Sequence, residues 1–281
     1  MRDEPGGQAL AHESGDLAGY VLIYLGWAWL FWSVVVLSGR SVWSFPNVVF
    51  FYVGSVSPTL AGVAMLYRTR GRRGLRELRD RLTDVRRVDG RWYAVVFLLY
   101  PSITVLAAGV AYLVGPTTTP LAPGELVERL RVPLSLLAFV GFTAGAGFVE
   151  ETGSTGYFLD RLVSTLGPVG GGAVSGTVWA SWHVPLFLME GYFGQASFQP
   201  VVPRFFVTFV FLETLFAWIY DNTDRSVLAA ALFHTTINLT GEVFAPSQQV
   251  RWYAFYLLAV ATVLIAVWRR VGSSSRRGET A

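Results

Sequence analysis

The sequence contains no cysteine and no lysine, and it is poor in charge. The absence of cysteine excludes a disulfide framework, a thiolate metal site and a cysteine nucleophile. The absence of lysine excludes chemistry that needs a Schiff-base lysine or a phosphate-binding lysine. Only 15% of the 281 residues are charged, whereas soluble domains have roughly 25%. Because 53% of the residues are hydrophobic, a disordered protein is excluded and an ordinary soluble enzyme is disfavoured.

Long apolar runs recur along the whole chain. A helix needs about 20 mostly apolar residues to cross a bilayer. Eight runs approach that length, at 20–37, 48–67, 92–114, 133–149, 169–189, 205–220, 227–244 and 252–268. Several tryptophans lie near the ends of these runs, as in the aromatic belt at a membrane interface. We therefore predict an all-α, polytopic membrane protein with about eight transmembrane helices.

The arginines are distributed unevenly between the connecting segments. Segment 68–91 holds ten of the 22. If this segment is cytoplasmic, both termini are cytoplasmic too, and 17 arginines lie on that side. Five then lie outside: Arg40, Arg129, Arg131, Arg204 and Arg251. This asymmetry satisfies the positive-inside rule, so we expect an integral protein of a prokaryotic cell membrane with both termini in the cytoplasm.

Segment 68–91 also has an apolar pattern. Leu75, Leu78, Leu82 and Val85 repeat at helical spacing between arginines and acids. The pattern predicts an amphipathic helix that lies on the anionic cytoplasmic leaflet, with anionic lipid as a partner. No nucleic-acid-binding module is present and topology accounts for the charge, so we do not expect nucleic acid as a partner.

A few ionisable or strongly polar residues lie within or beside the apolar runs, where each ionisable group costs roughly 2.5 kcal/mol or more at mid-membrane depth. They are Glu150, Glu151, His183, Glu213, His234, Asn238 and Glu242. Glu150 and Glu151 are neighbours and point about 100° apart on a helix. One of these carboxylates can therefore perform chemistry while the other anchors, or both can bind water at the interface.

Two histidines each share a helix face with an aromatic or polar residue one turn away. His183 follows Trp179 by one turn and serves either packing or catalysis. His234 and Asn238 form an i, i+4 pair, which can link helices or polarise a carbonyl. Glu213 lies in mid-run and is either hydrogen-bonded inside the bundle or part of a site. We place Glu242 at the outer interface.

Together these residues offer a base, an orienting histidine and a pair of donors for a developing anion. Acyl transfer to water needs such groups. A zinc site is the alternative, with Glu150, His183 and His234 as ligands. The sequence lacks an HExxH helix, which makes the zinc interpretation less specific.

Three motifs in this order resemble the CPBP family of membrane proteases, the CAAX-processing and bacteriocin-processing enzymes. They read EETGSTGYFLDRL (150–162), WASWH (179–183) and HTTIN (234–238). The resemblance implies an intramembrane endopeptidase with helices around a cytoplasm-facing cavity and no cofactor. It also implies that Glu150 activates water with help from His183. His234 and Asn238 would form the oxyanion hole, and Glu151 would be a supporting acid.

The chain departs from the family pattern at three positions. Ser154 and Thr155 replace the tryptophan and arginine of the first motif, and Trp179 replaces the phenylalanine of the second. An arginine at 155 would pair with a motif glutamate, whereas threonine can form a hydrogen bond but supplies no charge. The change leaves reduced activity, an altered pH dependence or a pseudoenzyme open.

We expect a cytoplasmic tail without order at 1–18 and N-terminal spans with the Arg-rich loop at 19–129. The protease-like core would cover 130–243, the last span 244–270 and a second tail 271–281. The predicted function is hydrolysis, by glutamate-activated water, of a peptide bond in a membrane-associated peptide or protein. The alternatives are a zinc protease, a non-catalytic scaffold or immunity-type protein, and a transporter in which Glu213 and the histidines relay protons.

Overall fold

The computed structural model describes residues 5–115, 119–123, 127, 129–130, 132–193 and 200–278. Within these ranges the regular structure is entirely helical, which confirms the predicted fold class. The α-helices are α1 (Pro5–Ser38), α2 (Asn47–Ser55), α3 (Ser57–Thr83), α4 (Gly90–Val114), α6 (Pro133–Gly153), α7 (Asp160–Trp182), α8 (Val202–Asn222), α9 (Val227–Phe244) and α10 (Gln248–Gly278). Short turns of other helix types are η1 (Val85–Arg87), η2 (Ser154–Leu159) and η3 (Val184–Leu188).

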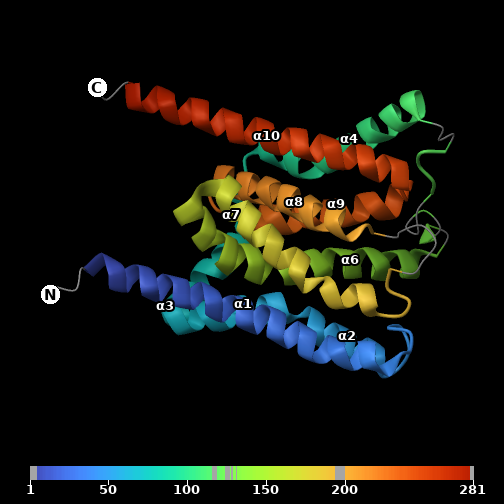
Figure 1. The fold of residues 1–281 in the computed structure, drawn as a ribbon, viewed down its shortest axis with the longest axis horizontal. Helices are drawn as coiled ribbons and strands as arrows, with labels where there is room; N and C mark the ends of the chain where they lie inside the picture. The colour runs from blue at the N-terminus through green and yellow to red at the C-terminus, as the bar shows by residue number, and fades with distance from the viewer. Residues whose placement is uncertain are drawn as a thin grey trace.

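Seven helical segments in the described part of the chain are long and apolar enough to span a membrane. We expected about eight. The count differs because the runs at 133–149 and 169–189 lie in one continuous helical segment, Pro133–Leu188. As one straight helix, its 56 residues would measure about 84 Å, far more than the ~30 Å hydrocarbon core. Instead, α6 and α7 run in opposite directions, so the segment forms a hairpin (Figure 1).

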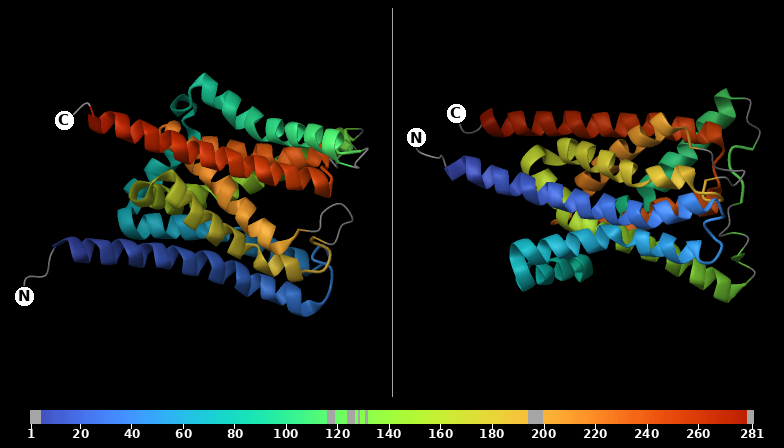
Figure 2. Two further views of the ribbon diagram at one scale, coloured as in Figure 1. Left: turned by 45° about the horizontal axis from the view of Figure 1, so that its top comes forward. Right: turned by 60° about the horizontal axis from the view of Figure 1, so that its bottom comes forward.

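The bundle has two distinct ends. Helix α1 begins and α10 ends at the same end, where the second half of α3 and the bend of the α6–α7 hairpin also lie (Figures 1 and 2). The loops that follow α1, α7 and α9 lie at the opposite end. The arrangement therefore puts the Arg-rich segment 68–91 at the same end as the start of α1 and the end of α10.

Both predicted tails are shorter than expected in the structure. Helix α1 starts at Pro5 and therefore includes most of the segment 1–18. Helix α10 continues to Gly278. The apolar spans themselves begin at Asp16 and end at Arg270, so these are polar extensions of membrane helices. Proline is well suited to the first helical position because its missing N–H has no partner there. Residues 1–4 and 279–281 lie outside the described residues.

Close backbone contacts at glycines fix the helices that surround the site. A Cβ atom on Gly172 would lie 2.6 Å from the Thr214 Cα, and one on Gly176 would lie 2.6 Å from the Phe209 carbonyl oxygen. Helices α7 and α8 therefore pack with their backbones in contact, as small residues allow in membrane proteins. Gly153, at the end of α6, leaves no room for a side chain against the Pro58 carbonyl group of α3.

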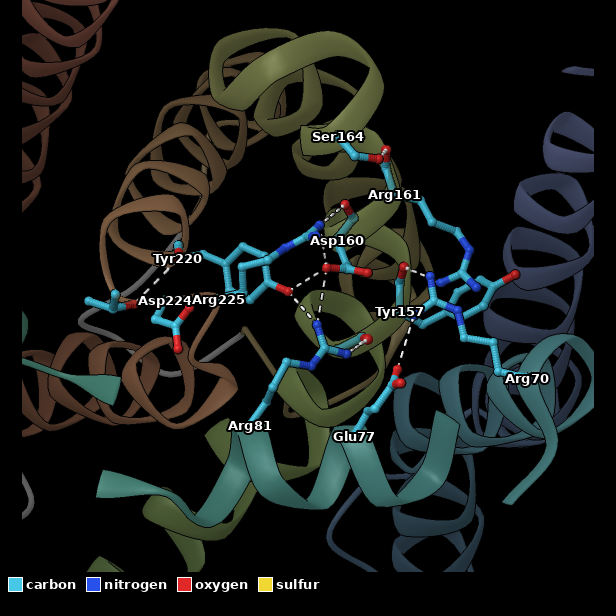
Figure 3. A network of polar contacts seen from close by, with 12 residues as sticks. Arg70, Glu77, Arg81, Tyr157, Asp160, Arg161, Ser164, Tyr220, Asp224 and Arg225 are labelled. Atoms are coloured by element: carbon cyan, nitrogen blue, oxygen red, sulfur yellow. Dashed lines mark hydrogen bonds and ion pairs between the residues drawn. The ribbon is translucent and has the colours of Figure 1, made fainter. Parts of the chain in front are cut away.

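The Arg-rich segment packs into the bundle through a buried polar network (Figure 3). Asp160 accepts hydrogen bonds at one oxygen from Arg81 (3.1 Å) and Tyr220 (2.6 Å), and the same oxygen lies 2.6 Å from Arg225. Arg81 also donates to the carbonyl group of Gly156 (2.7 Å). Asp160 is 4% exposed and Arg81 is 8% exposed. This network joins α3 to η2, α7 and α8.

This packing differs from the amphipathic surface helix that we expected. Leu78 is buried, and Leu75 and Leu82 are half-buried against the core, so the apolar face contacts protein. Only Val85 of the predicted stripe is exposed. The sequence pattern indicates an apolar face correctly, but it does not distinguish a protein surface from a lipid surface.

Candidate active site

The end of α6, the end of α7 and the middle of α9 bring the predicted polar residues together. Glu150 and Glu151 lie in the last turn of α6. His183 is the residue that follows α7, and His234 lies on α9, which packs against α6. The chain widens into the π-helical turn η2 directly after α6. Such turns are frequently found at functional sites.

Glu151 is the anchored member of the glutamate pair. Its side chain is 1% exposed. One carboxylate oxygen lies 2.8 Å from Nδ1 of His234, and the other accepts hydrogen bonds from Thr155 (2.5 Å) and Ser154 (3.2 Å). Both oxygens are therefore occupied, and the carboxylate orients the His234 ring. Because Nδ1 faces Glu151, Nε2 of His234 is left for the site.

Glu150 retains a carboxylate oxygen for other partners. Its Oε2 accepts a hydrogen bond of 2.9 Å from the indole nitrogen of Trp179, and the residue is half-buried. Within the described residues, its second oxygen has no hydrogen-bond partner. A carboxylate that is held on one side and open on the other has the arrangement that a general base needs.

His183 lies in an aromatic environment. Its Nδ1 is 2.9 Å from the carbonyl oxygen of Trp179, which can only accept, so Nδ1 carries a proton. The ring centroids of Trp182, Phe209 and Phe205 lie 4.8, 4.7 and 5.4 Å away. These contacts fix the ring plane and leave Nε2 as the nitrogen with an unshared electron pair.

Trp179 connects the members of the site, and the sequence pattern underestimated it. Its ring lies 5.9 Å from the His183 ring and 5.2 Å from the His234 ring, while its N–H binds Glu150. A phenylalanine, which the family motif has here, could not donate this hydrogen bond. The signal in the sequence was the substitution itself, which exchanges an apolar ring for one with a donor.

Other predicted residues lie at different distances from this centre. Asn238 follows His234 by one turn of α9 and is half-buried, without a hydrogen bond to any residue that the structure describes. Glu213 on α8 is 1% exposed, and Ser175 is its hydrogen-bond partner, but its Oε2 has no partner among the residues described. Glu242 is half-buried and interacts electrostatically with Arg251 instead.

The structure adds a residue that no motif indicated. Tyr20 on α1 is fully buried, and its ring stacks on that of Phe158 in η2 at 4.8 Å. Its hydroxyl group has no hydrogen-bond partner among the described residues, and it interacts electrostatically with Glu151 and Glu213. Its position depends on how α1 packs, so nothing in the local sequence could identify it.

The arrangement provides an open carboxylate and two oriented imidazoles next to a closed carboxylate–hydroxyl cluster. In the part of the chain that is described, no three His, Asp or Glu side chains are grouped as ligands for a metal ion. The fold and this cluster define a class, namely polytopic membrane proteins with a glutamate–histidine site between their helices.

Comparison with known proteins finds similar proteases. Residues 132–240 match the family model described as Type II CAAX prenyl endopeptidase Rce1-like, and this segment contains both glutamates, both histidines and Asn238 of the site. The chain is also 22% identical over 256 residues to the CAAX prenyl protease 2 of Methanococcus maripaludis, an alignment that covers 88% of this chain and 91% of that protein. These matches confirm the resemblance seen in the motifs: this chain is similar to the Rce1-like CAAX prenyl endopeptidases, a family of intramembrane proteases.

Proposed function

We propose that this protein is an intramembrane endopeptidase in which Glu150 activates the water that attacks the peptide bond. The observation that supports this role is the asymmetry of the two glutamates: Glu151 is fully hydrogen-bonded, whereas Glu150 has one open oxygen. Water is the nucleophile, so no covalent intermediate forms. Glu150 takes a proton from the water and passes it to the leaving amine.

The remaining residues have supporting roles in this proposal. Glu151 holds the His234 ring through Nδ1, so that Nε2 can donate to the developing oxyanion. Asn238 supplies a second donor from the next turn of α9. His183 accepts a hydrogen bond from the water at Nε2, because its Nδ1 carries the ring proton. Each donor has a fixed direction, which is how an enzyme stabilises charge that exists only in the transition state.

The substrate in this proposal is a membrane-associated peptide or protein. The name of the Methanococcus maripaludis relative makes prenylated CAAX peptides the first class to test. We further propose that the exposed arginines of segment 68–91 bind anionic lipid of the cytoplasmic leaflet. Arg68, Arg72, Arg76 and Arg79 are exposed and support this contact, although the apolar face of the segment packs on protein.

Cleavage by purified protein in detergent tests the proposed base. Prenylated and unprenylated peptides are supplied to the wild type and to Glu150→Gln. This substitution keeps the shape and the acceptor for Trp179 but removes the base, so we expect turnover to fall by about 10²–10⁴-fold while the protein stays folded. Glu190→Gln is the matched control, because Glu190 is exposed in the loop after α7. Equal turnover in Glu150→Gln and the control would contradict the role of Glu150.

The same assay separates the alternatives. In the metal-free mechanism, His234→Ala and Asn238→Ala each lower turnover by about 10²–10³-fold, and chelators leave it unchanged. If zinc is held by Glu150, His183 and His234, chelation abolishes activity and zinc restores it. A wild-type protein that cleaves no peptide in either form supports the non-catalytic scaffold.

A further inference from the structure

A cavity lies between α4, α8 and α10, and neither Glu150 nor Glu151 lines it. It has a volume of about 160 Å³ and is partly open. Its lining includes Tyr100 and Thr104 from α4, Arg204 and Leu212 from α8, and Arg251 and Leu258 from α10. Phe205 and Phe209 also line the cavity, and their rings contact His183 at 5.4 and 4.7 Å, so they lie between the cavity and that histidine.

Arg204 is the residue that indicates a ligand. It is 8% exposed, and its guanidinium group stacks over the Trp252 ring at 4.3 Å. Nη2 donates to Gln248 at 3.1 Å, but Nη1 is buried without an acceptor among the described residues. A buried charged donor without a partner is costly, and a planar guanidinium group in a fixed orientation suits the paired oxygens of an anion.

Further positive charge is directed to the same place. Arg251 lines the cavity, and its Nε donates to the Pro246 carbonyl group while Glu242 interacts with it. Helices α8 and α10 both begin beside the cavity, at Val202 and Gln248. Each helix start carries a partial positive charge of about half a unit. An arginine in the first turn of a helix is unfavourable against that dipole unless an anion is present.

The cavity changes character with depth. Arg204 and Arg251 lie near the helix starts at one end of the bundle, whereas Leu212 and Leu258 lie about two turns further in. Along α8, the distance from residue 204 to residue 212 is about 12 Å. At ~30 Å³ for each water molecule, the volume corresponds to about five waters. The space therefore suits a head group or a short chain segment, and it leads from charged to apolar surroundings.

We propose that this cavity binds an anionic membrane phospholipid, whose phosphate lies on Arg204 and Arg251 and whose acyl chain starts among Phe209, Leu212 and Leu258. Helices α4 and α10 expose large apolar side chains such as Leu106 and Leu264, so lipid surrounds the helices that form the cavity. The phosphate group satisfies Nη1 of Arg204 and compensates for the two helix starts. This site is independent of the proposed proteolysis.

The test uses the full-length protein, purified in a mild detergent and then mixed with phosphatidylglycerol, phosphatidylcholine or inorganic phosphate. Native mass spectrometry counts bound lipid, and thermal unfolding reports stabilisation. Arg204→Gln removes the guanidinium group, and Ala254→Leu fills the apolar part of the cavity, which Ala254 lines. Arg40→Gln, an exposed arginine at the same end of the bundle, is the matched control.

We expect the wild type and Arg40→Gln to retain phosphatidylglycerol in preference to phosphatidylcholine. Arg204→Gln and Ala254→Leu should both bind it at least tenfold more weakly. If Arg204→Gln does not fold, Arg204→Lys provides a second test. It keeps the positive charge but lacks the paired donors of the guanidinium group, so it should bind phosphatidylglycerol with intermediate affinity. Equal retention in all variants overturns the proposal. If inorganic phosphate stabilises the wild type and Ala254→Leu equally, the cavity is a site for a free anion. That result would also overturn the proposal that a lipid binds there.

Discussion

At the scale of single residues, Thr155 shows how a site can be rebuilt around a missing charge. The family motif has an arginine at this position, and an arginine would contribute a cation beside the glutamates. Here Thr155 and Ser154 instead donate two hydroxyl hydrogen bonds to Glu151. Thr155 is fully buried, so the surrounding side chains have closed over the smaller residue.

This arrangement predicts opposite effects for two substitutions at Thr155. Thr155→Val keeps the shape but removes the donor, so it should destabilise the protein by about 1.5–3 kcal/mol, as expected for a hydrogen bond to a charged group. Turnover should fall with it, because Glu151 orients His234. Thr155→Ser should restore both quantities. Thermal unfolding and peptide cleavage provide the measurements, and wild-type turnover in a folded Thr155→Val protein would contradict the positioning role.

Thr155→Arg decides whether the site is weakened or rebuilt. A weakened site would gain activity from the returned arginine, whereas a rebuilt site has no room for it. Because the Thr155 side chain is 0% exposed, we expect this variant to lose folded protein or activity.

The sequence indicated which residues to propose for the site but not their contacts. Glu150, Glu151, His183, His234 and Asn238 stood out because they are polar residues within or beside apolar runs and match three motifs in order. It could not indicate that the Trp179 N–H binds Glu150 or that the Tyr20 hydroxyl group lies near Glu151, since both depend on how separate helices pack. Arg204 was counted only as one positive charge on the outer side of the membrane, because its cavity forms only when separate helices pack together.

At the scale of secondary-structure elements, the Arg81–Asp160 pair holds the π-helical turn in place. Arg81 contacts both Asp160 and the Gly156 carbonyl group, and the π-helical turn contains Thr155. Removing one partner of a buried ion pair leaves the other charge unsatisfied, which typically costs 3–5 kcal/mol. Arg225 remains near Asp160 and compensates for part of that cost.

Arg81→Gln should therefore lower the free energy of unfolding by about 3 kcal/mol. Turnover should decrease as well, since η2 positions the donors to Glu151. The matched control is Arg79→Gln, an exposed arginine on the same helix that pairs with Asp80 at the surface. Its effect should stay below about 1 kcal/mol. Equal losses of stability in the two variants would show that the buried network does not fix the turn.

Hydropathy predicted the spanning elements because a backbone in lipid must satisfy its own hydrogen bonds, which restricts it to helices. The same reasoning does not predict how two runs connect. The runs at 133–149 and 169–189 are joined by a helical bend, and the break at Gly167 with φ 69° is a local conformation that hydropathy does not register. The packing of segment 68–91 on the bundle was missed for a related reason. An apolar helix face can contact either lipid or protein, and its sequence pattern is the same in both cases.

At the scale of the whole molecule, the absence of cysteine offers a direct test of orientation. Single substitutions such as Arg40→Cys and Arg86→Cys introduce the sole thiol at opposite ends of the bundle, and both side chains are exposed. Because segment 68–91 carries ten arginines, we expect its end to face the cytoplasm. An impermeant maleimide should then label Arg40→Cys in intact cells, and Arg86→Cys only after permeabilisation. The reverse pattern would place both termini, and the proposed site, on the other side of the membrane.

The hydrogen bond between Glu151 and His234 also has a consequence for biosynthesis. The two residues are 83 positions apart. At a synthesis rate of about 5–20 residues per second, Glu151 leaves the ribosome roughly 4–17 s before its histidine. Ser154 and Thr155 follow Glu151 by three and four positions and reach the membrane with it. Their hydroxyl groups can therefore cover the carboxylate during this interval, whereas a chain that relied on His234 alone would insert it without a partner.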